Sequence, residues 1–332
     1  MAVPSGALRF NADSRKLEYY NGEAWWQIDS FAPDAATGGA RGVWGGGFAP
    51  GGGNLAIDYV TISTTGNAIS FGNALTTYGG GSCASSTRGL FIAGSPGINN
   101  IEYITISSTG NAVTFGYLTE LRVTNVSSCS NSTRGIRAGG CLVPSFTGTS
   151  TIDYVTIAST GNAVSFGQLS ITRGRLGACA SSTRGIFFGG GYAPGPGVTN
   201  IIDYVTIAST GNPTYFGDLI NAQEGAHSAC SNSIRGIRAG GGPSNYRNVI
   251  EYITIASLGN SQNFGNISTA RPVGACASST RGIFGGGYTV PATYYNTIEY
   301  VTISTLGNAT NFGQLTLQRH NMSALSNGHG GL

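Results

Sequence analysis

The chain repeats one short phrase six times, and this repetition limits the folds that it can adopt. The phrase is I-[DE]-Y-[VI]-T-I; a Gly-Asn pair and then a Phe-Gly pair follow it, and an Arg-Gly pair precedes it. Its tyrosines are Tyr59, Tyr103, Tyr154, Tyr204, Tyr252 and Tyr300. Their spacing of 44 to 51 residues is typical of the four-stranded blade of a β-propeller.

One repeat divides into four expected strands, at residues 174–182, 184–189, 202–208 and 213–219. Along the third of these, side chains alternate between two faces, which is the pattern of a strand. A Ser-Ser-Thr turn, a glycine-rich loop and a Thr-Gly-Asn turn separate the strands. Gly and Asn suit such turns because they tolerate a positive φ.

The composition excludes several other classes of protein. Glycine contributes 54 of the 332 residues, and charged residues only 9%. A helical bundle or an α/β enzyme with an ordinary charged surface would have about 7% glycine and about 25% charged residues. The hydrophobic share of 40% excludes disorder. A turn-rich, all-β protein remains.

The repeat is out of phase at the two ends of the chain. Repeated sequence begins with a second strand at residues 41–47, and the final RHNMSALSNGHGG aligns with residues 173–185. We therefore expect the C-terminus to supply the first strand of a blade whose other strands come from the N-terminal portion. Sharing one blade in this way leaves no exposed sheet edges. The expected fold class is all-β, a six-bladed propeller with four-stranded blades.

The order of these features resembles the kelch repeat over roughly residues 38–330. Phenylalanine of the Phe-Gly pair stands where that family usually has tryptophan. The resemblance implies a kelch-like propeller over residues 35–332. Within it the first turn alternates between CASS and CSNS, and this alternation in pairs favours an even number of blades.

Residues 1–34 lie outside the repeat, and they are expected to form a separate β-hairpin module. Asn21-Gly22 predicts a two-residue turn between two of its strands. The stretch SGALRFNADSRKLEYYNGEAWWQI resembles a short module of bacteriophage tail-fibre and other virion proteins. The resemblance implies that this module attaches the chain to other tail or capsid proteins of a virion.

Five of the six cysteines occupy one repeated position, namely Cys83, Cys129, Cys179, Cys230 and Cys276. Leu325 stands there in the sixth repeat, and leucine can replace neither a disulfide partner nor a metal ligand. We therefore expect thiols packed in the core, and no metal site or cofactor. Reduced thiols fit folding in a reducing cytoplasm.

Charge and hydropathy indicate neither a nucleic-acid nor a membrane partner. The net charge is +3 and no polybasic run occurs, so no nucleic-acid partner is expected. No apolar stretch reaches the ~18 residues of a membrane span, so membrane insertion is not expected. The N-terminus MAVPSGALRF lacks a charged segment followed by an apolar one, so no Sec export is expected.

Two charged positions recur once in every repeat, and we expect a structural role for both because catalytic residues occur once per site. The arginines of the Arg-Gly pairs are Arg41, Arg88, Arg134, Arg184, Arg235 and Arg281. The acids of the repeated phrase are Asp58, Glu102, Asp153, Asp203, Glu251 and Glu299. Two structural roles are possible for the arginines: each could pair with a carboxylate of its blade, or each could donate hydrogen bonds to the backbone. The functional alternative is an arginine-lined channel mouth that holds an anion.

No catalytic residues are predicted. Six-bladed sialidases need Asp and Trp in each of their sequence boxes, and the nearest stretches here, such as STGNAVSF, contain neither. Kelch-type copper oxidases need paired histidine and tyrosine ligands, and the histidines of the chain are only His227, His320 and His329. The acids outside the repeated position include Asp218 and Glu224, but nothing else indicates a paired-carboxylate glycosidase.

The connections between second and third strands differ in every repeat, whereas the first-to-second and third-to-fourth turns are nearly invariant. Since consecutive strands run antiparallel, the variable loops share one face, and variable loops on a rigid scaffold are where recognition usually lies. They carry the candidate binding residues Phe48, Phe146, Tyr192, Tyr246, Tyr288, Tyr294 and Tyr295. Such aromatic rings suit stacking on sugars or contact with a protein, although loops that drift without constraint could carry the same residues.

These features favour a non-enzymatic bacteriophage virion protein, a tail-fibre or appendage component that recognises the host surface, glycan or protein, through its variable loops. It would be assembled in the host cytoplasm and located in the virion. One alternative is a capsid decoration or tail scaffold protein that binds only other virion subunits. Another is an enzyme that degrades a surface glycan. The chain enters and leaves the propeller at the invariant-turn face, so the attachment module is expected opposite the variable loops.

Overall fold

The computed structural model describes residues 3–11, 16–28, 39–77, 79–92, 98–123, 127–145, 147–191, 197–224, 228–242, 246–291 and 293–332. These residues form strands and turns and contain no helix, so the expected all-β class is confirmed. The chain divides into two compact units, Met1–Gly39 and Ala40–Leu332. The boundary expected at residue 34 lies outside the described residues.

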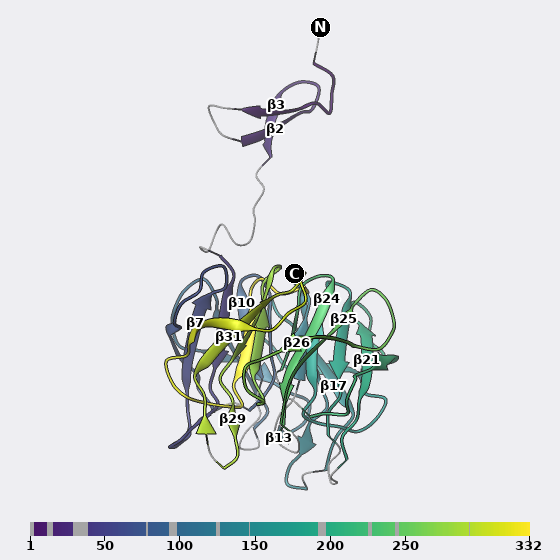
Figure 1. The fold of residues 1–332 in the computed structure, drawn as a ribbon. Helices are drawn as coiled ribbons and strands as arrows, with labels where there is room; N and C mark the ends of the chain where they lie inside the picture. Colours follow the sequence, from purple (N-terminus) through teal and green to yellow (C-terminus); the bar gives the residue numbers. More distant parts are fainter. Residues whose placement is uncertain are drawn as a thin grey trace. The chain divides into compact units, whose positions relative to one another are not determined.

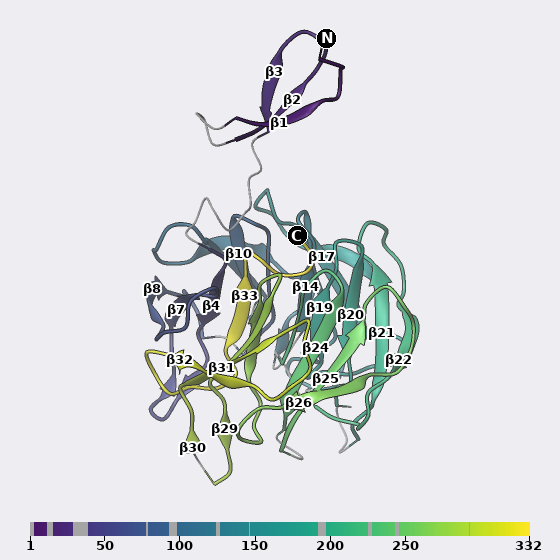
Figure 2. The same cartoon turned by 45° about the horizontal axis from the view of Figure 1, so that its top comes forward.

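The described part of Ala40–Leu332 forms six four-stranded antiparallel sheets, numbered I to VI along the chain (Figures 1 and 2). From first to fourth strand, sheet I contains β33 (Ser323–Ser326), β4 (Arg41–Gly45), β7 (Ala56–Thr61) and β8 (Ile69–Asn73); sheet II contains β9 (Ser82–Ala84), β10 (Arg88–Ile92), β11 (Asn100–Thr105) and β12 (Val113–Tyr117). Sheet III contains β14 (Ser127–Ser130), β15 (Arg134–Ala138), β17 (Thr151–Thr156) and β18 (Val164–Gln168); sheet IV contains β19 (Gly177–Ala180), β20 (Arg184–Phe188), β21 (Ile201–Thr206) and β22 (Thr214–Asp218).

The remaining two sheets follow the same plan. Sheet V contains β23 (Ala229–Ser231), β24 (Arg235–Gly241), β25 (Arg247–Thr254) and β26 (Gln262–Asn266); sheet VI contains β27 (Gly274–Ala277), β28 (Arg281–Gly285), β31 (Thr297–Thr302) and β32 (Thr310–Gln314). Short strand pairs lie in the connections, namely β5 (Phe48–Ala49) with β6 (Gly52–Gly53), β13 (Arg122–Val123) with β16 (Cys141–Leu142), and β29 (Tyr288–Thr289) with β30 (Thr293–Tyr294).

Sheet I contains strands from both ends of the chain, as the out-of-phase repeat predicts. The C-terminal strand β33 lies beside β4 (Figure 2) and pairs antiparallel with it, with Leu325 opposite Val43. Asn327 strengthens this junction, because its side-chain oxygen accepts a hydrogen bond of 2.7 Å from the backbone N–H of Arg41. The alignment of the chain's last residues with a first strand is therefore confirmed.

Each sheet is stabilised by the same internal contacts. The tyrosine of the third strand and the phenylalanine of the fourth meet edge to face, with ring centroids 5.7 to 6.0 Å apart. The first turn is closed by a side chain: the Ser85 hydroxyl accepts hydrogen bonds from the backbone N–H groups of Thr87 and Arg88, and Asn131 does the same in sheet III. Serine and asparagine recur there because their short side chains reach back to the backbone.

Neighbouring sheets approach closely because glycine faces the contact. The thiol of each repeated cysteine packs against the glycine of an Arg-Gly pair in the next sheet, for example Cys83 against Gly135, and a Cβ added to these glycines would lie only 2.5 to 3.2 Å from the sulfur. At the outer strands, the Gly-Asn turn of one sheet donates a backbone hydrogen bond to the Phe-Gly phenylalanine of the sheet before it. These bonds run from Gly66, Gly110, Gly161, Gly211, Gly259 and Gly307 to Phe312, Phe71, Phe115, Phe166, Phe216 and Phe264, at 2.8 to 3.0 Å.

The first strands of the six sheets also contact one another in sequence. β9 contacts β14, which contacts β19, and the series continues through β23, β27 and β33 back to β9. Their side chains surround a cavity of about 60 Å³, which is lined mainly by Ser, Ala and Cys. The five repeated cysteines are buried, and the six cysteines of the chain are free thiols.

The unit Met1–Gly39 contains a three-stranded antiparallel sheet in the order β1 (Leu8–Asn11), β2 (Lys16–Tyr20) and β3 (Trp25–Ile28). The expected two-residue turn at Asn21-Gly22 is wrong, because Tyr20 pairs with Trp25 and leaves a loop of four residues. Asn21 causes the difference: its side-chain oxygen accepts hydrogen bonds of 2.8 Å from the backbone N–H groups of both Glu23 and Ala24. Gly22 takes the positive φ of +106° that this loop requires.

Candidate functional site

Aromatic side chains from the variable loops gather around His320, which precedes β33. The centroid of the His320 ring lies 4.3 Å from that of Tyr288, 5.4 Å from that of Tyr294 and 5.8 Å from that of Phe48. Tyr246 extends the group, since its ring meets that of Tyr288 edge to face at 6.0 Å. We call these five residues the aromatic cluster. They come from the connections of sheets I, V and VI.

The backbone positions the cluster. His320 and Phe48 exchange backbone N–H···O hydrogen bonds of 2.9 and 3.0 Å, which bring the connection before β33 onto the loop after β4. Tyr288 and Tyr294 lie opposite each other in the β29–β30 hairpin, which projects from the end of the unit opposite the C-terminus (Figure 1). All five side chains are partly exposed.

The predicted binding residues divide into three groups in the structure. Phe48, Tyr246, Tyr288 and Tyr294 belong to the aromatic cluster. Tyr295 points to a different partner: the Arg271 guanidinium lies 5.1 Å from its ring centroid, and its hydroxyl lies 3.3 Å from that of Thr289. Phe146 and Tyr192 lie outside the described residues.

His320 is the cluster residue that the sequence analysis did not select. Burial lowers its pKa, although a hydrogen bond with Asn321 opposes the shift, and its Nδ1 has no hydrogen-bond partner in the described structure. A neutral imidazole ring is therefore favoured near pH 7, and the cluster carries no formal charge. Such a surface can stack on the C–H face of a sugar ring or on an aromatic side chain, and it offers tyrosine hydroxyls for hydrogen bonds.

The repeated Arg-Gly arginines do not pair with the repeated acids. Each guanidinium lies over the tyrosine of its own third strand, at 4.7 to 4.9 Å from the ring centroid. Each also donates hydrogen bonds of 2.7 to 3.2 Å to backbone carbonyls at the end of the third strand in the next sheet; Arg41, for example, bonds to Ile106. Of the two structural alternatives, the structure shows the bonds to backbone. The lining of the described cavity between the first strands contains no arginine.

A second set of arginines, missed by the sequence analysis, pairs with four of the six acids. The pairs are Arg122–Asp153, Arg173–Asp203, Arg271–Glu299 and Arg319–Asp58. Each of these arginines stands seven residues after the phenylalanine of a Phe-Gly pair. In the other two repeats that position holds Tyr78, which lies outside the described residues, and Gln223. The acids of these two repeats have other hydrogen-bond donors. Glu102 accepts hydrogen bonds from Thr76 and from the backbone of Leu75, and Glu251 accepts them from Ser261 and from the backbone of Ile220.

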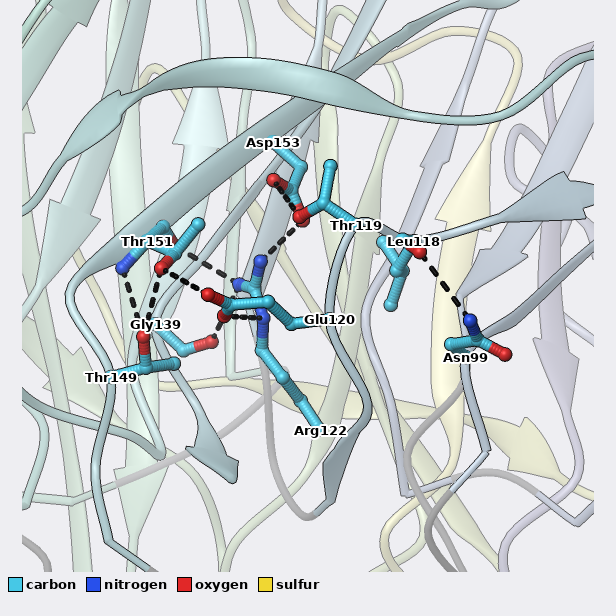
Figure 3. A network of polar contacts seen from close by, with 9 residues as sticks. All are labelled: Asn99, Leu118, Thr119, Glu120, Arg122, Gly139, Thr149, Thr151 and Asp153. Carbon is cyan, nitrogen blue, oxygen red and sulfur yellow. Dashed lines mark hydrogen bonds and ion pairs between the residues drawn. The ribbon is translucent and has the colours of Figure 1, made fainter. Parts of the chain in front are cut away.

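The Arg122 network shows how these pairs brace a connection (Figure 3). Arg122 is fully buried; it pairs with Asp153, lies 3.2 Å from a carboxylate oxygen of Glu120, and donates to the carbonyls of Gly139 and Thr151 at 3.2 and 3.0 Å. Burial lowers the pKa of Arg122, and the charges of Asp153 and Glu120 oppose that shift. These contacts tie the fourth-to-first connection to the third strand, so the role of the set is to position loops.

His329, in the C-terminal tail, connects the tail to the first strand of sheet II by a hydrogen bond. Its Nε2 donates to the Ala84 carbonyl at 2.9 Å, and its Nδ1 accepts a hydrogen bond of 3.1 Å from the Gly331 N–H. Both bonds together need the neutral ring, because a protonated Nδ1 accepts nothing. Burial lowers the pKa of His329 from its ordinary value, and the bond to Ala84 opposes the shift.

We expect the free energy of unfolding to fall as the pH drops below about 6.5. As the pH falls, the unfolded chain binds protons at His320 and His329 before the folded chain does, because burial lowers both pKa values in the folded state. The contribution of these two histidines to stability is therefore fully present above their unfolded pKa and is lost as the pH falls below it. Urea unfolding between pH 7.5 and 5.5 measures this. H329Q, whose amide still donates to Ala84, should remove part of the pH dependence, and H320Q a further part. An unchanged dependence in the double variant would contradict this account.

The described residues contain no group of His, Cys, Asp and Glu side chains that could hold a metal ion. Among the same residues, no helix has the length and apolar character needed to cross a membrane. No protein-family model matches the chain. A search of curated proteins likewise finds no match.

Proposed function

We propose that sheets I to VI are the blades of a closed, six-bladed, kelch-like propeller. Three sets of contacts support closure, because each runs through the sheets in order and returns from sheet VI to sheet I. They are the contacts between first strands, the Gly-to-Phe backbone bonds of the outer strands, and the Arg-Gly arginine bonds, in which Arg281 of sheet VI reaches Ile62 of sheet I. A ring with both termini in one blade has no free sheet edge to aggregate.

We infer that the protein is a non-enzymatic component of a bacteriophage virion, part of a tail fibre or appendage, that recognises the host surface through the aromatic cluster. Residues 1–34 would attach it to other tail or capsid proteins. The observation that carries the proposal is the gathering of four candidate loop residues into one partly exposed cluster. Loops that drift without constraint give no reason for aromatic rings from three sheets to converge.

The proposal includes a class of ligand. A surface glycan suits the cluster because its rings can stack on sugar faces while the tyrosine hydroxyls meet sugar hydroxyls. The cluster consists of three tyrosines, a phenylalanine and a histidine, which are side chains suited to stacking and hydrogen bonding, and we propose that it binds glycan without cleaving it. The rival proposal is a decoration or scaffold protein, in which the same face would contact only virion subunits.

A double variant, Y288A/Y294A, should weaken binding to host-envelope glycans at least tenfold, which is about 1.4 kcal/mol, because aromatic anchors dominate such interfaces. The measurement is binding of the full chain to an array of bacterial envelope glycans. Y117A is the matched control, since Tyr117 on β12 is 46% exposed and lies outside the cluster. Equal binding by wild type, Y288A/Y294A and Y117A would contradict the proposed site. Release of free sugar would instead identify a glycan-degrading enzyme.

A further inference from the structure

The three-stranded sheet of Met1–Gly39 has one face that is entirely apolar among its described side chains. Strand alternation places Leu8 and Phe10 of β1, Leu17 and Tyr19 of β2, and Trp26 of β3 on this face. The register joins them, because Leu8 lies opposite Tyr19, Phe10 opposite Leu17, and Tyr19 opposite Trp26. We call these five side chains the apolar face. They are 39 to 66% exposed.

The opposite face carries the polar groups, and they satisfy one another. Arg9 pairs with Glu18 at 2.8 Å and lies over the ring of Trp25, at 4.1 Å from its centroid. Asn11 donates a hydrogen bond of 2.8 Å to the same carboxylate. The bonds from Asn11 and Arg9 lower the pKa of Glu18. The ionised groups described in these strands are thus paired on one side of the sheet, and the other side carries no charge.

A sheet of this size needs a cover for its apolar face. A chain segment shorter than about 40 residues rarely buries enough apolar surface to fold alone, and oligomerisation is a usual remedy. At their observed exposures the five side chains present on the order of 500 Å² of apolar surface, as much as the largest patch of a typical monomer. Two such faces packed together would bury on the order of 1,000 Å², which reaches the lower bound for a specific interface.

We propose that the apolar face packs against the same face of a second copy of this chain, so that two three-stranded sheets form a small sandwich. Because the face carries no charge, bringing two identical faces together creates no like-charge contact. Strand faces of this kind interdigitate when two sheets pack about 10 Å apart. A self-complementary contact of this type closes as a dimer.

This inference goes beyond the proposed function and does not rest on it. If both hold, the dimer presents two aromatic clusters, and simultaneous engagement of two sites raises the strength of attachment. The two can fail separately. A monomeric variant retains the aromatic cluster, so its affinity for a single glycan in solution is unchanged even though its mass is halved and the gain from two-site attachment is lost.

Sedimentation of the full chain tests the dimer. We expect the wild type at micromolar concentration to have about twice the mass of one 33.9 kDa chain. F10S/W26S should have the mass of one chain at the same concentration. The control is L258T, which replaces a leucine that is 57% exposed in the other unit by the threonine found at the equivalent Thr210. It should remain a dimer. A wild-type mass of one chain, or a dimeric F10S/W26S, overturns the proposal.

A second measurement leaves the apolar face intact, so it does not depend on how F10S/W26S folds. The difference between wild type and W26F in acrylamide quenching of fluorescence reports the accessibility of Trp26. We expect Trp26 to be shielded from acrylamide in the dimer and to become accessible on dilution. Free accessibility at all concentrations contradicts the proposal. Shielding in a chain that sediments as a monomer also overturns it, because the cover would then come from the chain itself.

Discussion

Replacing Arg319 by methionine should lower the free energy of unfolding by about 3–5 kcal/mol. Arg319 is fully buried, and its guanidinium donates to the carbonyls of Gly46, Ala56 and Trp44 as well as to Asp58 at 2.8 Å. The substitution leaves Asp58, itself 1% exposed, as a buried charge whose remaining bonds among the described residues come from Thr316. The arginine joins the connection before β33 to sheet I, so its loss also weakens the junction between the two ends of the chain.

Denaturant unfolding at pH 7 measures this effect, and two further variants test its cause. R319M/D58N leaves no buried charge at the site, so it should be more stable than R319M alone. R319Q places at this position the residue that sheet V carries as Gln223, which donates to the Gly240 carbonyl, and it should fall between wild type and R319M. A loss below 1 kcal/mol in R319M would show that the buried pairs do not hold the connections.

Replacing Gly116 by alanine should destabilise the protein by about 3 kcal/mol, at the upper end of the cost of overpacking. A Cβ at this position would overlap the carbonyl oxygen of Gly161 in the next sheet, and that atom belongs to rigid backbone. The Gly161 N–H donates to the Phe115 carbonyl at 3.0 Å, so relief of the overlap would pull apart a bond between sheets III and II.

Gly161 provides the matched control for this prediction. A Cβ on Gly161 meets nothing within 4 Å, and neither Gly116 nor Gly161 has the positive φ that strains an alanine. G161A should therefore change stability by no more than about 0.5 kcal/mol. Equal effects of G116A and G161A would show that the close approach of neighbouring sheets does not set the cost, because alanine at an unstrained position reduces the entropy of the unfolded chain and carries no penalty of its own.

Most of the strand plan could be predicted because each element repeats a local signal six times. The third strand of sheet IV is observed at Ile201–Thr206 against an expected 202–208, and its fourth at Thr214–Asp218 against 213–219. The role of the C-terminus as a first strand followed from alignment alone. The turn at Asn21 was predicted wrongly because a side-chain hydrogen bond, which the Asn-Gly pair does not reveal, sets the length of the loop.

The candidate site was harder to predict than the strands. Loop aromatic residues could be selected because the loops differ between repeats, but the sequence does not say which of them converge. Tyr295 lies next to Tyr294, yet it faces Arg271 instead of His320. The buried arginines were missed because only four of six repeats contain one at seven residues after phenylalanine. A search for repeat positions at which most, but not all, of the repeats carry the same charged residue would have found them.

The most direct test of the central claim is the location of this chain in an intact phage particle, determined by cryo-electron microscopy. The account predicts a six-bladed ring at a tail fibre or appendage, held through residues 1–34, with Tyr288, Tyr294 and His320 facing away from the particle. A ring whose aromatic cluster is buried against capsid or tail subunits, or a particle that lacks the chain, would contradict it.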